Sequence, residues 1–378
     1  MGKALVRVDT NPATGRRHLV AYVVPAEGEV QVTGALDPYA WQQLLDGGRD
    51  ALANESELRK TDLVEFDGVW ASLTSLCLPV VARTFAQLGA FNRAGAEVTA
   101  EEIVTGAGVR AEHPGLVCHW LEALAGEGLL DRTGPGRYRC REPFDLAALD
   151  EKVRAGFADL AATGPGRILA DYLAACAERQ LDLLQGRVSP LELLMPEGGF
   201  HVTGMLYADN PVSQVQNAVV AAVVAQACAA GAARVLEVGA GTGATTAQVL
   251  PALAAEGVRY RFTDVSTFFT ERARRAFADY PFVDFTPYDV DRDPSGQGVA
   301  PGTMDVVVAA NVLHDARDLS VTLRHLRVSS HPAVFWCCWK GPRTPSSRPS
   351  PSVFWRGSPG MPGSGIFRCS PPPSGGRS

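Results

Sequence analysis

A glycine-rich turn follows a short apolar run in the second half of the chain. The run ARVLEV leads directly into Gly239, Ala240, Gly241 and Gly243, and the helical stretch ATTAQVLPAL comes next. Glycines at a strand-to-helix turn let a ligand touch the backbone at a helix N-terminus. Glu237 precedes the first glycine by two residues, and a carboxylate there suits a cofactor with a cationic end. The pattern predicts a cofactor site, and a solvated charge at a strand end is the alternative interpretation of Glu237.

Further polar residues follow the next three strand-like runs, YRFTDVS, VDFTPYDV and MDVVVAANVL. Asp264 closes the first of these runs, where a carboxylate can accept both hydroxyls of an adenosine ribose. Dehydrogenases that bind a dinucleotide share a similar turn and this aspartate, so they remain an alternative. Asp289 can reach the exocyclic amine of adenine, although it could equally be one of several loop acids in DVDRD. Asn311 and His314 follow the last run and are predicted to lie beside the glycine turn.

His314 is the residue best suited to catalysis. An imidazole with a pKa of about 6.5 can remove a proton at neutral pH, as methyl transfer to a carbon between two carbonyls requires. A buried structural histidine is the alternative. No metal is needed for this chemistry, and the eight cysteines show no metal-ligand spacing and are interpreted as reduced thiols.

These residues need a parallel sheet to bring them together. From residue 196 onward, apolar strand runs alternate with helical segments, which predicts a doubly wound α/β core with helices on both faces. Residues 64–195 are predicted to be mainly helical, and VTAEEIVTGAGVRAEHPGLVCHWLEALAGEGLLDRTGPGRYRC within them has a winged-helix-like order of helix, turn, helix and hairpin. Its second helix carries Glu122 and Glu127 but no arginine or lysine, which disfavours DNA binding. ALVRV and HLVAYVV predict a hairpin near the start.

Composition excludes several classes of function. The 378 residues are 46% hydrophobic with a net charge of −6, and no uninterrupted apolar run reaches membrane-spanning length. Residues 329–378 contain six basic residues and no acidic one, so the remainder carries −12. An acidic body argues against a nucleic-acid partner. No secretion signal is evident at the N-terminus, so a cytoplasmic location is expected.

Several sequence blocks resemble a known family. LYADNPVSQVQNAVV, VLEVGAGTGATTAQVLPAL, FTDVS, YDVDRDPSGQG and VVAANVLHDARDLSVTLRHLR look like the methyltransferase domains of modular polyketide synthases and hybrid nonribosomal peptide synthetases, over residues 66–327. The run HLVAYVVPAEGEV resembles the small C-terminal subdomain of adenylation domains, a known insertion point for methyltransferase domains. The resemblance implies the class I fold that depends on S-adenosylmethionine (SAM), preceded by a lid domain.

The resemblance also implies roles for single residues and for partners. His314 matches the family's catalytic histidine, and Tyr207, Val265 and Val290 are expected in the SAM site with the residues named above. The acceptor in this family is usually the α-carbon of a β-ketoacyl thioester on an acyl carrier protein. An acyl or peptidyl carrier protein with a phosphopantetheine-tethered substrate, and neighbouring synthase domains, are therefore the expected partners.

The last fifty residues depart from the family pattern. The family continues with a Pro-Gly-Gly turn and a fifth strand that ends in a glutamate, the partner of the histidine, whereas this chain has VSSHPAVFWCCWKGPRTPSSRPS. We interpret this as the loss of one base near codon 328. The hypothesis predicts a sheet truncated after its fourth strand, an out-of-frame and disordered tail over 329–378, and an inactive protein. The missing glutamate would stand near Trp339 and Lys340.

The resulting domain prediction has four parts. They are an adenylation-like hairpin remnant at 1–40, a helical winged-helix-like lid at 64–195, a SAM-binding core at 196–328, and the tail. Two alternatives keep the SAM fold: transfer of the methyl group to nitrogen, sulfur or oxygen, and a degenerate domain that no longer catalyses. A dehydrogenase is the third alternative.

Overall fold

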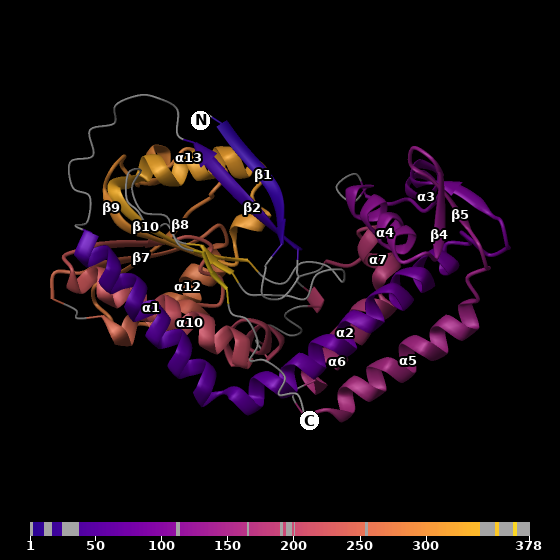
Figure 1. Cartoon of the computed structure of the whole chain (residues 1–378), viewed down its shortest axis with the longest axis horizontal. Helices are drawn as coiled ribbons and strands as arrows, with labels where there is room; N and C mark the ends of the chain where they lie inside the picture. Colours follow the sequence, from indigo (N-terminus) through magenta and orange to yellow (C-terminus); the bar gives the residue numbers. More distant parts are fainter. Residues whose placement is uncertain are drawn as a thin grey trace. The chain divides into compact units, whose positions relative to one another are not determined.

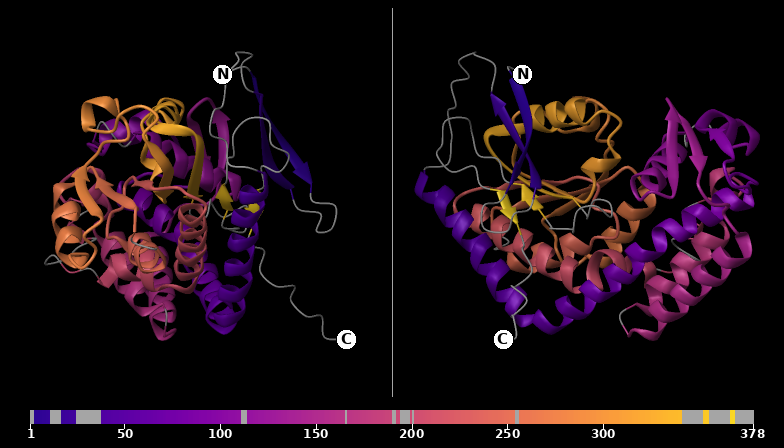
Figure 2. Two further views of the ribbon diagram at one scale, coloured as in Figure 1. Left: turned by 90° about the vertical axis from the view of Figure 1, so that its left-hand side faces the viewer. Right: turned by 45° about the vertical axis from the view of Figure 1, so that its right-hand side comes forward.

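The computed structural model describes residues 3–10, 17–24, 38–110, 114–164, 166–189, 192–193, 199, 201–253, 256–340, 352–354 and 366–368. The chain divides into two compact units (Figures 1 and 2). One is Arg49–Val219, and the other combines Met1–Gly48 with Val220–Ser378. Each unit is described by itself.

The unit Arg49–Val219 is built on long helices. They are α1 (Pro38–Leu58), which begins in the other unit, α2 (Lys60–Gln87), α5 (Leu146–Ala162), α6 (Arg167–Glu178), α7 (Gln180–Leu184), α9 (His201–Gly204) and the π-helix η2 (Met205–Asp209). α2 buries Phe66, Val69, Leu73 and Leu76, which recur at the spacing of one helical face. Gly156 of α5 allows a close approach, because a Cβ there would lie 2.3 Å from Leu76 Cδ2.

A winged-helix-like subdomain follows α2 in the chain, as predicted. Its elements are β3 (Glu97–Thr99), α3 (Ala100–Gly106), α4 (Pro114–Gly126), β4 (Leu130–Gly134) and β5 (Arg137–Cys140), with the antiparallel strand order β3-β5-β4. Thr99 and Glu102 form a capping box that begins α3. On α4, Glu122 accepts hydrogen bonds from Arg132 and Tyr138. The basic side chain on the wing nearest α4 is thus neutralised by an acid, which agrees with the argument against DNA binding.

The other unit contains the predicted parallel sheet. Four parallel strands lie in the order β9-β6-β7-β8 within it: β6 (Arg234–Glu237), β7 (Arg259–Asp264), β8 (Val283–Pro287) and β9 (Met304–Ala310). The connecting elements are α10 (Pro211–Ala229), α11 (Ala244–Val249), η3 (Leu250–Ala252), α12 (Thr267–Ala276), η4 (Ser295–Gln297), η5 (Leu313–Asp315) and α13 (Leu319–Ser329). α13 lies on one face of the sheet and α12 on the other (Figure 1), which confirms the doubly wound α/β class.

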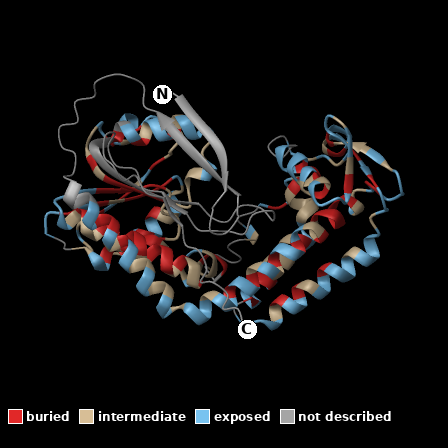
Figure 3. Cartoon of the chain, in the orientation of Figure 1, coloured by how far each residue is buried: buried red, intermediate tan, exposed pale blue. Residues whose placement is uncertain are grey.

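The strands of this sheet are buried on both faces. Val235 and Leu236 of β6 and Val307 and Val308 of β9 are each at most 1% exposed, and Figure 3 draws the central strands mostly in the colour of buried residues. Near-continuous apolar runs of this kind are typical of parallel strands covered by helices. Since β6 lies between β7 and β9, the segments after these strands meet at one edge of the sheet.

The predicted truncation of the sheet after its fourth strand is wrong. β10 (Ser330–Lys340) pairs in parallel with β9, with a shift of register between Ser330 and Phe335, and β11 (Ser352–Phe354) and β12 (Ile366–Arg368) extend the sheet antiparallel to it. Aromatic and β-branched residues favour strands, and the edge of β9 offers unpaired backbone groups to the run AVFWCCW. These strands fall within the predicted disordered tail, which stays a prediction, and the rest of 341–378 lies outside the described residues.

The predicted N-terminal hairpin is present. β1 (Lys3–Thr10) and β2 (Arg17–Val24) pair antiparallel as a two-stranded sheet, and its origin as an adenylation-domain remnant stays a prediction. Elsewhere, α2 and α10 are long and apolar enough to cross a membrane by length and composition. Their most apolar windows are 50% and 56% buried within the protein, which is typical of core helices.

Candidate functional site

The glycine turn after β6 has the backbone that its sequence predicts. Gly239, Gly241 and Gly243 have φ values of 59°, 55° and 81°, in the left-handed region that favours glycine. A Cβ on Gly239 would lie 2.2 Å from Val312 Cγ2, and one on Gly243 would lie 2.8 Å from Phe277 Cε2. A Cβ on Gly241 would meet only a backbone oxygen at 3.9 Å. Two of the glycines therefore serve packing, and Gly241 leaves its backbone open to a ligand.

Asp264 lies directly against this turn. Its Oδ2 accepts a hydrogen bond from the Gly241 N–H at 2.9 Å, its Oδ1 accepts one from the Ser266 N–H at 2.8 Å, and the Ala240 N–H donates to the Thr263 carbonyl at 2.9 Å. Burial raises the pKa of Asp264, while the two hydrogen bonds from backbone N–H groups act to lower it. Each carboxylate oxygen keeps a second lone pair, so the predicted contact with ribose hydroxyls remains available.

Val265, the next residue, is 69% exposed at the same edge of the sheet. A single exposed apolar side chain is common at protein surfaces and does not by itself assign a role. Its predicted place in the cofactor site stays a prediction.

Glu237 is 1% exposed, so the alternative of a solvated strand-end charge is wrong. Its Oε2 accepts hydrogen bonds from Thr246 Oγ1 at 2.6 Å and from the Tyr260 hydroxyl at 2.7 Å. Its Oε1 is buried and has no hydrogen-bond partner among the described residues. Burial raises the pKa of Glu237 to about 7. One acceptor of this carboxylate is thus left for a donor that the described part of the chain does not supply.

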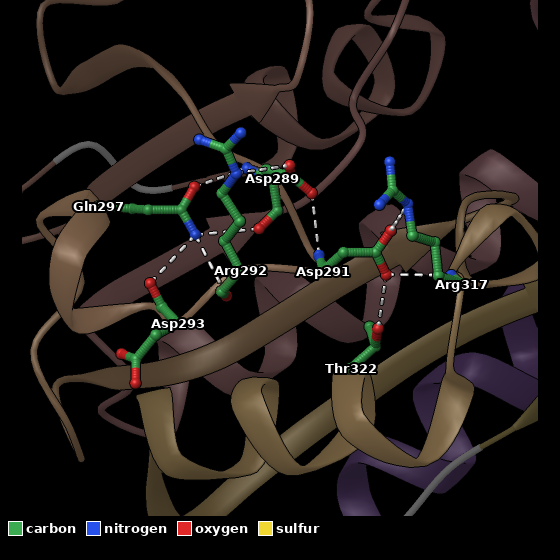
Figure 4. Close-up of polar contacts among 7 residues, drawn as sticks. All are labelled: Asp289, Asp291, Arg292, Asp293, Gln297, Arg317 and Thr322. Atoms are coloured by element: carbon green, nitrogen blue, oxygen red, sulfur yellow. Dashed lines mark hydrogen bonds and ion pairs between the residues drawn. The ribbon is translucent and has the colours of Figure 1, made fainter.

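Asp289 follows β8, and its carboxylate is engaged within its own loop (Figure 4). Oδ1 accepts a hydrogen bond from the Asp291 N–H at 3.0 Å, and Oδ2 lies 3.2 Å from Arg292 Nε. Gln297 binds the backbone of Asp289 twice. Its Oε1 accepts a hydrogen bond from the Asp289 N–H at 2.7 Å, and its Nε2 donates one to the Asp289 carbonyl at 2.9 Å. Val290 packs against the core. These contacts fit the alternative of a loop acid as well as an adenine contact.

A pocket of about 200 Å³ opens beside this loop. It brings the segment after β8 together with the segment after β9, and its lining consists of Asp289, Asp291, Arg292, Arg317, Asp318 and Val321.

Asn311 and His314 follow β9, and Val312 between them lies against Gly239 of the glycine turn; their predicted role in the site stays a prediction. Asn311 has a φ of 53°, in the left-handed region that asparagine tolerates better than most residues. The His314 side chain is 40% exposed and its Nε2 lies 3.3 Å from Asp315 Oδ1. His314 is therefore not a buried structural histidine. In β10, Trp339 pairs with Ala310, so the position expected for the family's glutamate lies beside the strand that leads to His314.

Tyr207 belongs to the unit Arg49–Val219, within the π-helix η2. Its carbonyl accepts a hydrogen bond from Asn217 Nδ2 at 3.0 Å, and its side chain is 38% exposed. Short π-helical segments are frequent at functional sites. The role of Tyr207 in cofactor binding stays a prediction.

Sequence reasoning missed three residues that this arrangement depends on. Thr246 and Tyr260, which hold Glu237, occupy a helix and the neighbouring strand, and they carried no signal beyond polar atoms in apolar runs. Asp291 is one of several acids in DVDRD, and no local pattern distinguishes it from the others. Its partners Arg317 and Thr322 lie 26 and 31 residues further along the chain.

Comparison with known proteins agrees with this geometry. A family model described as "Methyltransferase domain" matches residues 236–332. Pyochelin synthetase PchF of Pseudomonas aeruginosa is 32% identical over 268 residues, which make up 68% of this chain and 14% of PchF. The chain thus spans about one seventh of that relative's length.

Solved structures give the same result for the fold. The CurJ carbon methyltransferase has a TM-score of 0.71 and 26% identity, with 83% of this chain and 81% of that chain covered. The trans-methyltransferase CalH, solved as a complex with SAH, has a TM-score of 0.51 and 22% identity, with 73% of each chain covered. At that identity, the likeness to CalH shows the fold alone.

Proposed function

We propose that this chain, which belongs to the SAM-dependent methyltransferases, methylates the α-carbon of a β-ketoacyl intermediate held by a carrier protein. The observation that carries the proposal is the junction of the open glycine turn, held by Asp264, with the segment that bears His314 after the adjacent strand β9. Similarity to the CurJ carbon methyltransferase supports carbon as the acceptor.

The residues at this edge of the sheet fit SAM. Glu237 Oε1, buried and without a partner among the described residues, can accept a hydrogen bond from the cofactor's ammonium group. The Gly241 backbone is open to close approach, Asp264 retains free lone pairs, and Val265 offers an exposed apolar surface. The remaining residues proposed for the site are Gly239, Ala240, Gly243, Asp289, Val290 and Asn311, whereas Tyr207, in the unit Arg49–Val219, stays a prediction from the sequence.

His314 is proposed as the catalytic base. SAM supplies an electrophilic methyl group on a sulfonium, so the protein needs to generate a nucleophilic carbon. The exposed imidazole can accept the acidic proton that lies between the two carbonyls of a β-ketoacyl thioester.

The C-terminal sequence bears on whether this chain turns over. We propose that one base is lost near codon 328, which puts Trp339 and Lys340 where the family has its glutamate. β10 supplies a strand at the expected place, and a tryptophan or lysine there cannot accept a proton-linked hydrogen bond from the histidine. On this proposal the chain binds SAM and fails to methylate.

The test compares two proteins with one assay. The chain as it stands and the chain with the frame restored after codon 328 are each incubated with labelled SAM and a β-ketoacyl carrier protein. Methylated carrier is expected only from the restored chain. Full activity of the present chain would refute the frame-loss hypothesis, and no product from either protein, with SAM bound, would indicate a degenerate domain.

The acceptor atom is the finer part of the proposal. Similarity to a pyochelin synthetase keeps nitrogen, sulfur or oxygen as the alternative, because the name of PchF does not specify carbon methylation. Fragmentation of the carrier-bound product by mass spectrometry locates the new methyl group. The proposed partners are a carrier protein with its phosphopantetheine-tethered substrate and neighbouring synthase domains, in the cytoplasm.

A further inference from the structure

Asp291 connects two segments that start far apart on the sheet. β8 and β9 are separated by β7 and β6, so their ends are three strand spacings, about 14 Å, from each other. Asp291 lies just after β8, and it contacts Arg317 and Thr322, which lie after β9 (Figure 4).

The side chain of Asp291 makes hydrogen bonds to two residues of the segment after β9. Oδ1 accepts a hydrogen bond from the Arg317 backbone N–H at 3.0 Å and one from Thr322 Oγ1 at 3.3 Å. The Asp291 side chain is 22% exposed and Thr322 is fully buried. The ion pair with Arg317 Nε, at 3.8 Å, adds little because that side chain is 91% exposed. The bond to the Arg317 N–H therefore fixes the backbone three residues beyond His314.

The same residue also contacts the proposed cofactor site on its other side. The Asp291 N–H donates to Asp289 Oδ1 at 3.0 Å. Asp291 thus holds the Asp289 turn through its backbone and the segment after β9 through its side chain.

We propose that Asp291 is a positioning residue that keeps the segment from Asn311 to Arg317 in place against the Asp289 turn, so that SAM meets both already ordered. This inference rests on the proposed function. A ligand that meets a preformed site avoids the entropy cost of ordering a loop. Loss of the Asp291 side chain should therefore weaken SAM binding without unfolding the domain.

The chain offers a matched control in the same loop. Asp293 is also an aspartate that accepts a backbone hydrogen bond, from the Ser295 N–H at 2.8 Å, and its side chain is exposed. Its partner lies within the loop, so Asp293→Ala removes one carboxylate without cutting a link between segments.

The experiment measures SAM affinity by titration calorimetry and amide hydrogen exchange in the full chain. Asp291→Ala is expected to raise the Kd for SAM about tenfold and to speed exchange at Arg317, while Asp293→Ala stays within twofold of the unmodified chain on both measures. Asp291→Asn keeps an acceptor for the Arg317 N–H and is expected to restore most of the affinity.

Each result has a definite meaning. Equal SAM affinity in Asp291→Ala and the unmodified chain would overturn the proposal, as would an equal loss in Asp293→Ala. If the unmodified chain does not bind SAM, the proposed function fails; hydrogen exchange at Arg317 then still shows whether Asp291 holds the segment. A variant that unfolds is recognised by its thermal melt. If Asp291→Ala unfolds, Asp291→Asn carries the test. Unchanged hydrogen exchange at Arg317 and unchanged SAM affinity in Asp291→Asn would support the proposal, and losses in both would overturn it.

Discussion

The glycine turn yields a prediction in which two similar substitutions have different effects. Gly239 and Gly241 share a left-handed backbone, with φ values of 59° and 55°. Alanine in that conformation costs about 1 kcal/mol of folding stability at either position. Their surroundings differ, because a Cβ on Gly239 would lie 2.2 Å from Val312 Cγ2, whereas one on Gly241 would meet only the Gly239 carbonyl at 3.9 Å.

The magnitudes follow from this difference. Gly239→Ala adds overpacking to the backbone cost, on the order of 1 to 3 kcal/mol, so the free energy of unfolding should fall by about 2 to 4 kcal/mol. Gly241→Ala should lose about 1 kcal/mol of stability. It should instead lower the affinity for SAM at least tenfold, because its methyl group occupies the space where a ligand would contact the backbone.

Chemical denaturation measures the first quantity and titration calorimetry the second. A second substitution sharpens the test: Val312→Ala removes the two methyl groups, at 2.2 and 3.3 Å, and keeps Val312 Cβ at 2.7 Å. The clash is therefore relieved in part, and the double variant should be more stable than the sum of the single changes by about 1 kcal/mol. The reasoning is refuted if both glycine variants lose equal stability, or if Val312→Ala fails to relieve Gly239→Ala.

Three further predictions concern Glu237, its neighbours and His314. The pKa of Glu237 in the folded protein, about 7, lies above its ordinary value of 4.5, so its contribution to stability is complete below pH 4.5 and is lost as the pH rises to about 7, a change of about 3 kcal/mol. Glu237→Gln should remove that dependence in melts recorded from pH 4 to 8, and an unchanged profile would contradict the assignment. Tyr260→Phe removes a donor to the Glu237 carboxylate and should cost about 1 to 3 kcal/mol at pH 8 and less at pH 5, measured by denaturation; equal losses at both would count against it. His314→Ala, in the frame-restored chain, should leave SAM affinity within twofold and abolish methylated carrier in a mass assay; retained product would exclude the proposed base.

Local patterns in the sequence predicted most of the sheet and the turn. The glycines, Glu237, Asp264 and His314 all follow apolar strand runs, and the rule that open α/β sheets bind ligands at the carboxyl ends of their strands placed them at one edge. That rule needs only the order of strands and helices, which the sequence pattern predicts.

Contacts between residues that are far apart in the sequence could not be predicted from local patterns. The burial of Glu237 by Thr246 and Tyr260 depends on how α11 and β7 pack, and the link from Asp291 to Arg317 depends on a crossover that no local pattern encodes. β10 was missed for a different reason. Its aromatic run AVFWCCW has strong strand propensity, and the open edge of β9 can pair with such a run whether or not the reading frame is lost.

The most direct test of the central claim is calorimetric titration of the full chain with SAM, repeated with NAD. The account predicts that one molecule of SAM binds per chain, that Gly241→Ala weakens this binding, and that NAD gives no heat of binding. Binding of NAD without SAM would contradict the account and restore the dehydrogenase alternative.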